Sequence, residues 1–409
     1  MLTSRQNLIL LSLLLLAMSL RVGAAVVIDR HVHNEGRPFL IEGDANGYWD
    51  LARKIAGGQD YSIYTPPRQV LRTPGFPLLL ATSILVFGES IFAASLMMAA
   101  VGTGCCWLTW LLARRVTSVS VANVALLIVA ISPLQIGSNV QILSETLFSL
   151  GLLASLFPLT KLVETEETLT AGHSFVAGLL TGLTTLVRPG WILWPWLTSM
   201  LVVFGSKQAW KRRFFFVILI FAGCFLALLP WAWRNHNVTG HWIFTSLWSG
   251  PSLYDGLHPG ATGASDMTFV DAENVFSTMS EYDANAHYKQ RAFEFAVNNP
   301  GRTIELAILK AGRYLSPTLN AAGFAGGPVF AVCLVWYAAF GVLVAAGLAS
   351  LRKQPLVVLL LSGPFLQFLV VHMVFVGSIR YRLPVEFPLS IIAAQGLSAM
   401  KAKIGESRS

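Results

Sequence analysis

The residues of this sequence most able to do chemistry are acids and arginines at the ends of apolar stretches. Asp44 lies two residues after Glu42, Arg72 precedes a Pro-Gly turn, and Glu145 opens an apolar run. A carboxylate in such a place can act as a general base or as a ligand to a metal ion. An arginine beside it can bind a lipid phosphate through paired hydrogen bonds.

Each of these residues also has a purely structural interpretation. Asp44 precedes a predicted helix and can cap its N-terminus, and Glu145 is favourably placed near the positive end of a helix dipole. Arg72 can simply extend toward lipid headgroups. The local pattern leaves both interpretations open, and for Asp44 the two roles are compatible.

More basic and aromatic residues stand where apolar runs end. Arg234 follows a Pro-Trp-Ala-Trp run, Arg188 precedes a proline, and Arg380, Tyr381 and Arg382 precede the last apolar run. Such residues are common membrane-interface anchors. Taken together, Arg72, Arg234, Arg380 and Arg382 predict a cationic ring suited to an anionic lipid headgroup. The eight histidines show no metal-ligand spacing, and no Gly-rich nucleotide loop is present.

The composition indicates what must position these residues. Hydrophobic residues make up 54% of the 409, and charged residues only 12%, about half the share typical of soluble domains. The net charge of +8 comes from basic residues in short runs between apolar stretches, as membrane topology requires. We therefore expect an all-α polytopic membrane protein and no binding of nucleic acid.

Apolar runs recur along the whole chain and predict about ten spanning helices. The first is preceded by one arginine and contains a small-residue segment, 22–25, like a signal-peptide cleavage site. Its full length favours an uncleaved span. A further run, 76–87, is short and predicts a half-embedded helix. The expected spans are 8–28, 91–113, 119–133, 144–160, 174–187, 191–204, 214–233, 328–351, 356–376 and 387–399.

The basic clusters predict the orientation. With the N-terminus in the cytoplasm, every compact basic pair or triplet between spans falls inside. Residues 1–400 then form one membrane domain and 401–409 a short cytoplasmic tail. Two long segments, about 29–90 and 234–327, face outward. Apolar spacing predicts an interfacial helix near 48–55 in the first and another at 300–315 in the second, opened by Asn299-Pro300.

These motifs, in this order, resemble the GT-C superfamily of polyprenyl-phosphate-sugar-dependent glycosyltransferases, the group that includes protein O-mannosyltransferases and lipid A aminoarabinose transferase. The resemblance covers nearly the whole chain. Each motif is weak, whereas the ordered set is fairly specific. The matching pieces are Gly43-Asp44 with Tyr48 and Ala52, Arg72–Pro77, Ser144-Glu145, Arg188-Pro189, the run ending in Arg234-Asn235, and Arg380–Pro384.

The resemblance implies a GT-C-like bundle and roles for these residues. Asp44 would be the catalytic base, and Glu145 would be a second catalytic residue with an acidic side chain. A divalent cation, Mg²⁺ or Mn²⁺, would bind at Asp44 or Glu145 if at all. Some relatives have two adjacent acids in the first loop, whereas Asp44 is followed here by Ala45. The donor phosphate would be bound by Arg72, Arg234, Arg380, Arg382 and Tyr381, with Glu42, Tyr48 and Arg188 in support.

The expected partners are a polyprenyl-phosphate sugar donor, a lipid, glycan or protein acceptor, and the lipid bilayer. We expect transfer on the outer face of a bacterial inner membrane. One alternative is a flippase or transporter of lipid-linked sugars, which would line its spans with polar residues. The spans are nearly free of charge, with Arg21 the main exception. Another alternative is a glycan ligase or polymerase that uses a lipid-pyrophosphate donor.

Overall fold

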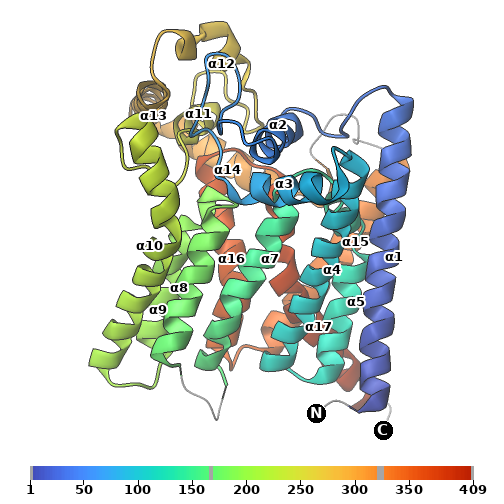
Figure 1. Ribbon diagram of the computed structural model, residues 1–409. Coiled ribbons are helices and arrows are strands. Elements are labelled where there is room, and N and C mark those ends of the chain that lie inside the picture. Colours follow the sequence, from blue (N-terminus) through green and yellow to red (C-terminus); the bar gives the residue numbers. More distant parts are fainter. Residues whose placement is uncertain (1–2, 165–168, 320–326, 407–409) are drawn as a thin grey trace.

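A computed structural model describes residues 3–164, 169–319 and 327–406. Long helices stand side by side in a bundle, and a layer of shorter helices covers one end of it (Figure 1). Both termini lie at the opposite end. Within the described ranges the only β pairing is an isolated antiparallel bridge between Ile63 and Arg68. The expectation of an all-helical protein is therefore confirmed.

The bundle is formed by helices from the whole length of the chain. Its members are α1 (Ser4–Asn34), α4 (Ile91–Val116), α5 (Val119–Ile131), α7 (Glu145–Leu156) with η1 (Phe157–Leu162), α8 (Ala171–Thr185), η2 (Pro189–Leu193) with α9 (Trp194–Gly205), α10 (Trp210–Thr239), α15 (Gly327–Ser350), α16 (Pro355–Val374) and α17 (Leu383–Glu406).

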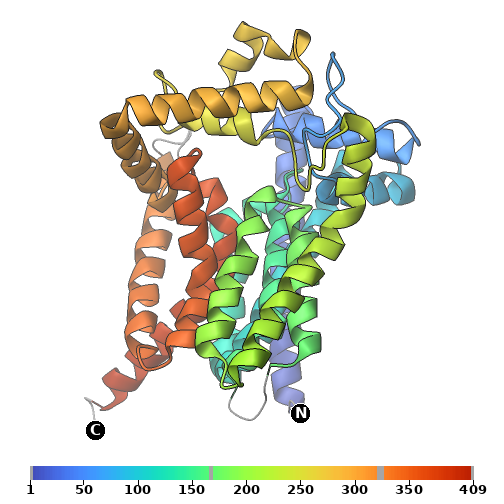
Figure 2. The same ribbon diagram turned by 90° about the vertical axis from the view of Figure 1, so that its left-hand side faces the viewer.

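The covering helices, which we call the outer layer, come from the two long segments between spans. They are α2 (Asp44–Ala56), α3 (Gly75–Phe87), α11 (Ser249–Gly256), α12 (Thr268–Glu273), α13 (Glu281–Asn298) and α14 (Pro300–Leu315). Short elements at other turns are α6 (Pro133–Ser138), η3 (Val275–Ser277) and η5 (Ile379–Tyr381). Figure 2 shows α13 lying across this end of the bundle.

In the part of the chain that the structure describes, seven helices are long and apolar enough to cross a membrane, which confirms a multi-pass integral membrane protein. The expected spans at 119–133, 174–187 and 191–204 are also helical, but α5, α8 and α9 are shorter. The count of ten therefore stays a prediction. The seven are Ser4–Asn34, Ile91–Val116, Glu145–Leu162, Trp210–Thr239, Gly327–Ser350, Pro355–Val374 and Leu383–Gly405.

Small residues allow the bundle helices to pack backbone against backbone. A Cβ at Gly178 in α8 would lie 2.0 Å from the carbonyl oxygen of Ile220 in α10. A Cβ at Gly347 in α15 would lie 1.9 Å from that of Ile392 in α17. Within lipid the association of helices depends on such close packing, because lipid tails are as apolar as the side chains.

The outer layer contains the two expected amphipathic helices. On α2, Leu51 and Ala52 are buried. On α14, Ile304 and Ile308 are exposed on one side. Pro300 is the first residue of α14 and Asn299 occupies its N-cap position, as expected, although the Asn299 side chain makes no capping hydrogen bond. The Asn299 amide instead donates a hydrogen bond to the carbonyl oxygen of Phe295, 3.0 Å away, because residue 299 directly follows the end of α13.

Candidate functional site

Asp44 is the first residue of α2, and its carboxylate contacts two arginines from distant parts of the chain. Gly43 occupies the N-cap position with φ 74°, and no side chain caps the helix. One oxygen of Asp44 accepts a hydrogen bond from Arg72 Nη2 at 2.9 Å. The other lies 3.1 Å from Arg380 Nη2. The interpretation of Asp44 as a helix cap is therefore wrong, because its oxygens bind guanidinium groups.

Glu145, the first residue of α7, joins the same group of charges. Its Oε1 atom pairs with Arg380 Nε and lies 3.0 Å from Arg188 Nη1. Only 4% of its side chain is exposed. Arg380 thus links the two acids, which are 101 positions apart in the chain. We call Asp44, Arg72, Glu145, Arg188 and Arg380 the carboxylate–arginine cluster.

Two glycines make room for the arginines of the cluster. A Cβ at Gly47, one turn after Asp44, would lie 3.2 Å from Arg72 Nε. Gly75, in the turn after Arg72, donates its backbone N–H to the carbonyl oxygen of Leu186 at 2.8 Å. A Cβ there would also lie 2.8 Å from that oxygen. This hydrogen bond at the Pro-Gly turn therefore joins the segment that carries Arg72 to the segment that leads into Arg188.

Aromatic rings cover the guanidinium groups. The Arg72 guanidinium lies over the Tyr48 ring at 4.4 Å, and that of Arg188 over the Tyr381 ring at 5.0 Å. The His372 ring stacks on the Tyr381 ring, with 4.1 Å between the two ring centroids. Such cation–π contacts stabilise a cation that has lost part of its hydration. Sequence patterns gave no indication of His372, because nothing in its spacing marks it.

The charges set the protonation state of Asp44. Partial burial by itself raises the pKa of this carboxyl, but Arg72 and Arg380 outweigh burial and hold the pKa well below its usual range. In turn Asp44 helps to raise the pKa values of Arg72 and Arg380 above the ordinary guanidinium value, against the effect of their own burial. Asp44 is therefore ionised and, while it is paired in this way, only a weak base.

The structure does not bring all four arginines of the predicted ring together. Arg234 donates to the backbone carbonyl oxygens of Gln69 at 2.6 Å and Tyr61 at 3.1 Å. Arg382 bonds Glu386 Oε1 at 2.8 Å and is buried. Only Arg72 and Arg380 of the four belong to the cluster, because tertiary packing gives the other two different partners.

The remaining candidates divide in the same way. Arg188 and Tyr48 lie in or against the cluster, whereas Glu42 is exposed. Arg21, the charged exception within the spans, is buried in α1 and bonds the carbonyl oxygens of Val129 and Ala130 at the end of α5 at 3.2 and 3.4 Å. These carbonyls have no partner within their own helix, so Arg21 completes the end of α5.

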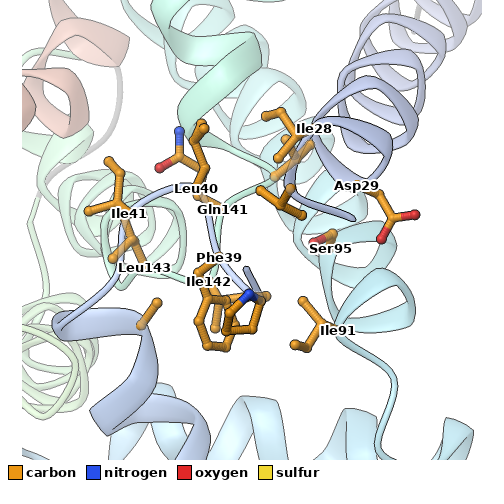
Figure 3. A pocket seen from close by; sticks show the side chains of 14 residues that line it. Ile28, Asp29, Phe39, Leu40, Ile41, Ile91, Ser95, Gln141, Ile142 and Leu143 are labelled. Carbon is orange, nitrogen blue, oxygen red and sulfur yellow. The ribbon is translucent and has the colours of Figure 1, made fainter. Parts of the chain in front are cut away.

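A hollow of about 380 Å³, including space open to solvent, is lined by residues that are close in sequence to both acids. Ala45, next to Asp44, and Leu143, two residues before Glu145, both line it. Most of its other side chains are apolar (Figure 3), among them Ile28, Phe39, Leu40, Ile41, Ile91 and Ile142. The hollow therefore suits an apolar group placed next to the cluster.

The donor atoms do not fit a divalent cation. Among the described residues, no group of three or more His, Cys, Asp or Glu side chains is arranged to hold a metal ion. Asp44 and Glu145 are joined through a guanidinium group rather than turned toward a shared point. A cation there would have to displace Arg380, so we derive no step through a metal.

Comparison with known proteins supports the expected resemblance. Residues 71–233 match the family model described as dolichyl-phosphate-mannose-protein mannosyltransferase. This region contains Arg72, Glu145 and Arg188, while Asp44 and Arg380 lie outside it. No curated protein sequence matches the chain.

Solved structures share the fold across the chain. The oligosaccharyltransferase AglB from Archaeoglobus fulgidus, in complex with an inhibitory peptide and a dolichol-phosphate, matches with TM-score 0.58 and 14% identity over 99% of this chain and 52% of its own. Its apo form gives 0.56 and 14% over 98% and 51%, and a form in complex with Zn and sulfate gives 0.55 and 13% over 97% and 49%.

A further match is ArnT from Cupriavidus metallidurans bound to undecaprenyl phosphate, with TM-score 0.47 and 14% identity over 97% of this chain and 78% of its own. The chain spans about half the length of the oligosaccharyltransferase. The match of residues 71–233 to the mannosyltransferase family model, and the fold shared with the oligosaccharyltransferase over 99% of this chain, both agree with the ordered motifs of the sequence.

Proposed function

We propose that this protein transfers a sugar from a polyprenyl-phosphate-linked donor to a hydroxyl acceptor on the outer face of the membrane, with Asp44 as the base. The observation that carries the proposal is that Arg72 and Arg380 together hold the carboxylate of Asp44, while Arg380 also pairs with Glu145. Two arginines that hold a partly exposed carboxylate are equally suited to hold a phosphate. The mannosyltransferase family match over residues 71–233 supports the same class of donor.

The donor phosphate changes the partners of Asp44. When it enters, Arg72 and Arg380 turn from the carboxylate to the phosphate oxygens. Asp44 then loses the two cations that depress its pKa, so its basicity rises at the moment the donor is in place. The site is thus a poor base when empty and a competent one when loaded.

The transfer step follows from this exchange. Asp44 removes the proton of the acceptor hydroxyl, and that oxygen forms a bond to the anomeric carbon. The bond between the anomeric carbon and the phosphate oxygen breaks, and its electron pair stays on the phosphate. Because negative charge grows on the leaving polyprenyl phosphate, the arginines stabilise the transition state more than the bound donor. Glu145 keeps Arg380 and Arg188 oriented throughout.

The apolar hollow beside Asp44 suits the isoprenoid part of the donor. Its lining is mostly aliphatic and aromatic, and it includes Ala45, the neighbour of Asp44 in the chain. We place the cluster outside, both termini in the cytoplasm and ten helices across a bacterial inner membrane. Cysteines introduced near residue 5 and near residue 260 would test this orientation, since only the second should react with a membrane-impermeant maleimide in intact cells.

Transport of lipid-linked sugars is the competing function. Arg21, the main charged exception within the expected spans, is bound to carbonyl oxygens at the end of α5, which weakens the case for a polar path. A ligase or polymerase would use a lipid-pyrophosphate donor on the same cluster. Offering both donors to one preparation separates these functions.

The deciding experiment uses the full chain in nanodiscs, a labelled polyprenyl-phosphate sugar and an envelope extract as acceptor. Parent protein is compared with Asp44→Asn and with Asp50→Asn, an exposed acid on the same helix. We expect transfer by the parent and by Asp50→Asn and none by Asp44→Asn. Transfer from a lipid pyrophosphate alone would establish the ligase. Movement of donor across the bilayer of sealed proteoliposomes without transfer would establish the transporter.

A further inference from the structure

The backbone that carries Arg380 is attached to α14 by side chains that the transfer mechanism leaves unused. Lys310 Nζ donates to the carbonyl oxygen of Val374, the last residue of α16, at 2.8 Å. One turn later on α14, Arg313 Nε donates to the carbonyl oxygen of Gly377 at 3.0 Å. Lys310 and Arg313 therefore both bind the backbone where α16 ends and leads into η5.

The attachment continues on the other side of Arg380. Arg382 Nη1 donates to the carbonyl oxygens of Tyr314 and Ser316, at the end of α14, at 3.0 and 2.9 Å. Arg380 thus stands in a segment that is fixed to one helix both before and after it. Lys310 and Arg313 donate to the backbone of this segment and not to the side chains of the cluster, so their effect passes through the backbone of 374–382.

The fit between α14 and this segment leaves no space. Gly377 lies so close to Lys310 that a Cβ at 377 would come within 2.2 Å of the Lys310 carbonyl oxygen. The Gly377 N–H also donates to the carbonyl oxygen of Gly263 at 3.1 Å. A larger residue here must push the connection away from α14.

Lys310 is an unusual residue for a merely structural contact. It is 0% exposed, and burial lowers the pKa of its ammonium to about 8, against the attraction of Asp255. It therefore stays largely protonated at neutral pH. A cation at the carboxyl end of α16 is favoured by the helix dipole, but a lysine buried for stability alone costs more than an apolar side chain of similar size.

We infer that Lys310 and Arg313 are positioning residues, which set the place of Arg380 between Asp44 and Glu145 and thereby the affinity of the site for the donor phosphate. The inference rests on the proposed function. Arg380 is the group that joins the two acids, and a displacement of about 1 Å in a group of this kind is enough to impair binding and catalysis.

The first test uses two glycine substitutions, one in the connection before η5 and one on α14. Gly377→Ala introduces the Cβ that collides with α14, whereas Gly312→Ala, on α14 itself, meets nothing within 4 Å. The probe is undecaprenyl phosphate, titrated into the full-length protein in nanodiscs. We expect Gly377→Ala to bind the probe roughly tenfold more weakly, as for the loss of one charged hydrogen bond, and Gly312→Ala to bind it as the parent does.

The second test removes the buried charge. Lys310→Met is compared with Lys289→Met, the same change at an exposed site on the neighbouring helix α13. We expect only Lys310→Met to weaken binding of undecaprenyl phosphate, with Lys310→Arg restoring part of it. In an assay of transfer the loss should fall on the KM for the donor more than on kcat.

A double-mutant cycle separates positioning from general damage to the fold. In an Arg380→Gln background, Lys310→Met should cause no further loss of binding, because the group it positions is gone. An equal additional loss there, or unchanged binding in both Lys310→Met and Gly377→Ala, overturns the inference. Failure of the parent to bind undecaprenyl phosphate overturns the proposed function instead, so the two failures are distinguishable.

Discussion

Arg380 and Arg382 are two positions apart, and each pairs with carboxylates in a different setting. The Arg380 side chain is 24% exposed and is shared between Asp44, itself 40% exposed, and the buried Glu145. The Arg382 side chain is 7% exposed and is sealed against Glu386, the Tyr337 ring and the carbonyl oxygens at the end of α14.

The difference shows how accessibility separates a site from a support. The partners of Arg380 compete for it, and a ligand phosphate that reaches the cluster can replace one of them. Arg382 has no such freedom, because exchange of its partner would leave Glu386 buried and unpaired, which is strongly destabilising. We expect substitutions of Arg380 or its two acids to change binding and catalysis. Substitutions of Arg382 or Glu386 should instead change stability.

The largest expected effect comes from Asp44→Asn. Loss of the base should reduce transfer by about 10²- to 10⁴-fold. The same variant should bind undecaprenyl phosphate at least as tightly as the parent, because the carboxylate no longer competes for Arg72 and Arg380. Titration of the lipid into the purified variant measures this. Weaker binding would mean that Asp44 helps to hold the phosphate and would end the exchange mechanism.

Next in size is Arg382→Gln, which leaves Glu386 without its cationic partner. We expect a loss of stability of about 3–5 kcal/mol, measured by chemical denaturation in detergent, and an unchanged donor KM in the protein that remains folded. Joint replacement, Arg382→Met with Glu386→Gln, should recover part of the stability. A raised donor KM with normal stability would place Arg382 in the site and remove the contrast with Arg380.

A smaller effect is expected from Arg380→Lys. Lysine keeps the charge but cannot pair with both acids at once through a planar fork, so the donor KM should rise about tenfold, the equivalent of one charged hydrogen bond. Arg234→Lys serves as the matched control, because that guanidinium binds backbone carbonyls behind the cluster. Equal changes in donor KM at the two positions would contradict the division between them.

The smallest effect concerns pH. The pKa of Asp44 is depressed, so its ion pairs are fully formed above the ordinary carboxyl pKa of about 4 and are lost only as the pH falls through the lower value. The difference in melting temperature between parent and Asp44→Asn should therefore stay constant from neutral pH down to about pH 4. If the difference in melting temperature disappears well above that pH, Arg72 and Arg380 do not lower the pKa of Asp44 in the purified protein.

Much of the fold was determined locally. Apolar runs predict helices because each residue must satisfy its backbone within lipid, and all ten expected positions are helical. The same reasoning placed acids and arginines at the ends of these runs and so found every member of the carboxylate–arginine cluster. The family match covers residues 71–233, a range that includes Arg72, Glu145 and Arg188, and their roles stay predictions.

Tertiary structure alone decided how these residues are paired. The sequence cannot distinguish Arg380 from Arg382, because the short turn η5 directs one toward α2 and α7 and the other toward α14 and α17. Lys310 looks like any lysine on an amphipathic helix until α16 is packed against it. Apolar periodicity acts over a few residues, whereas the choice of partner for a charge depends on segments hundreds of positions away, and only the folded chain brings those together.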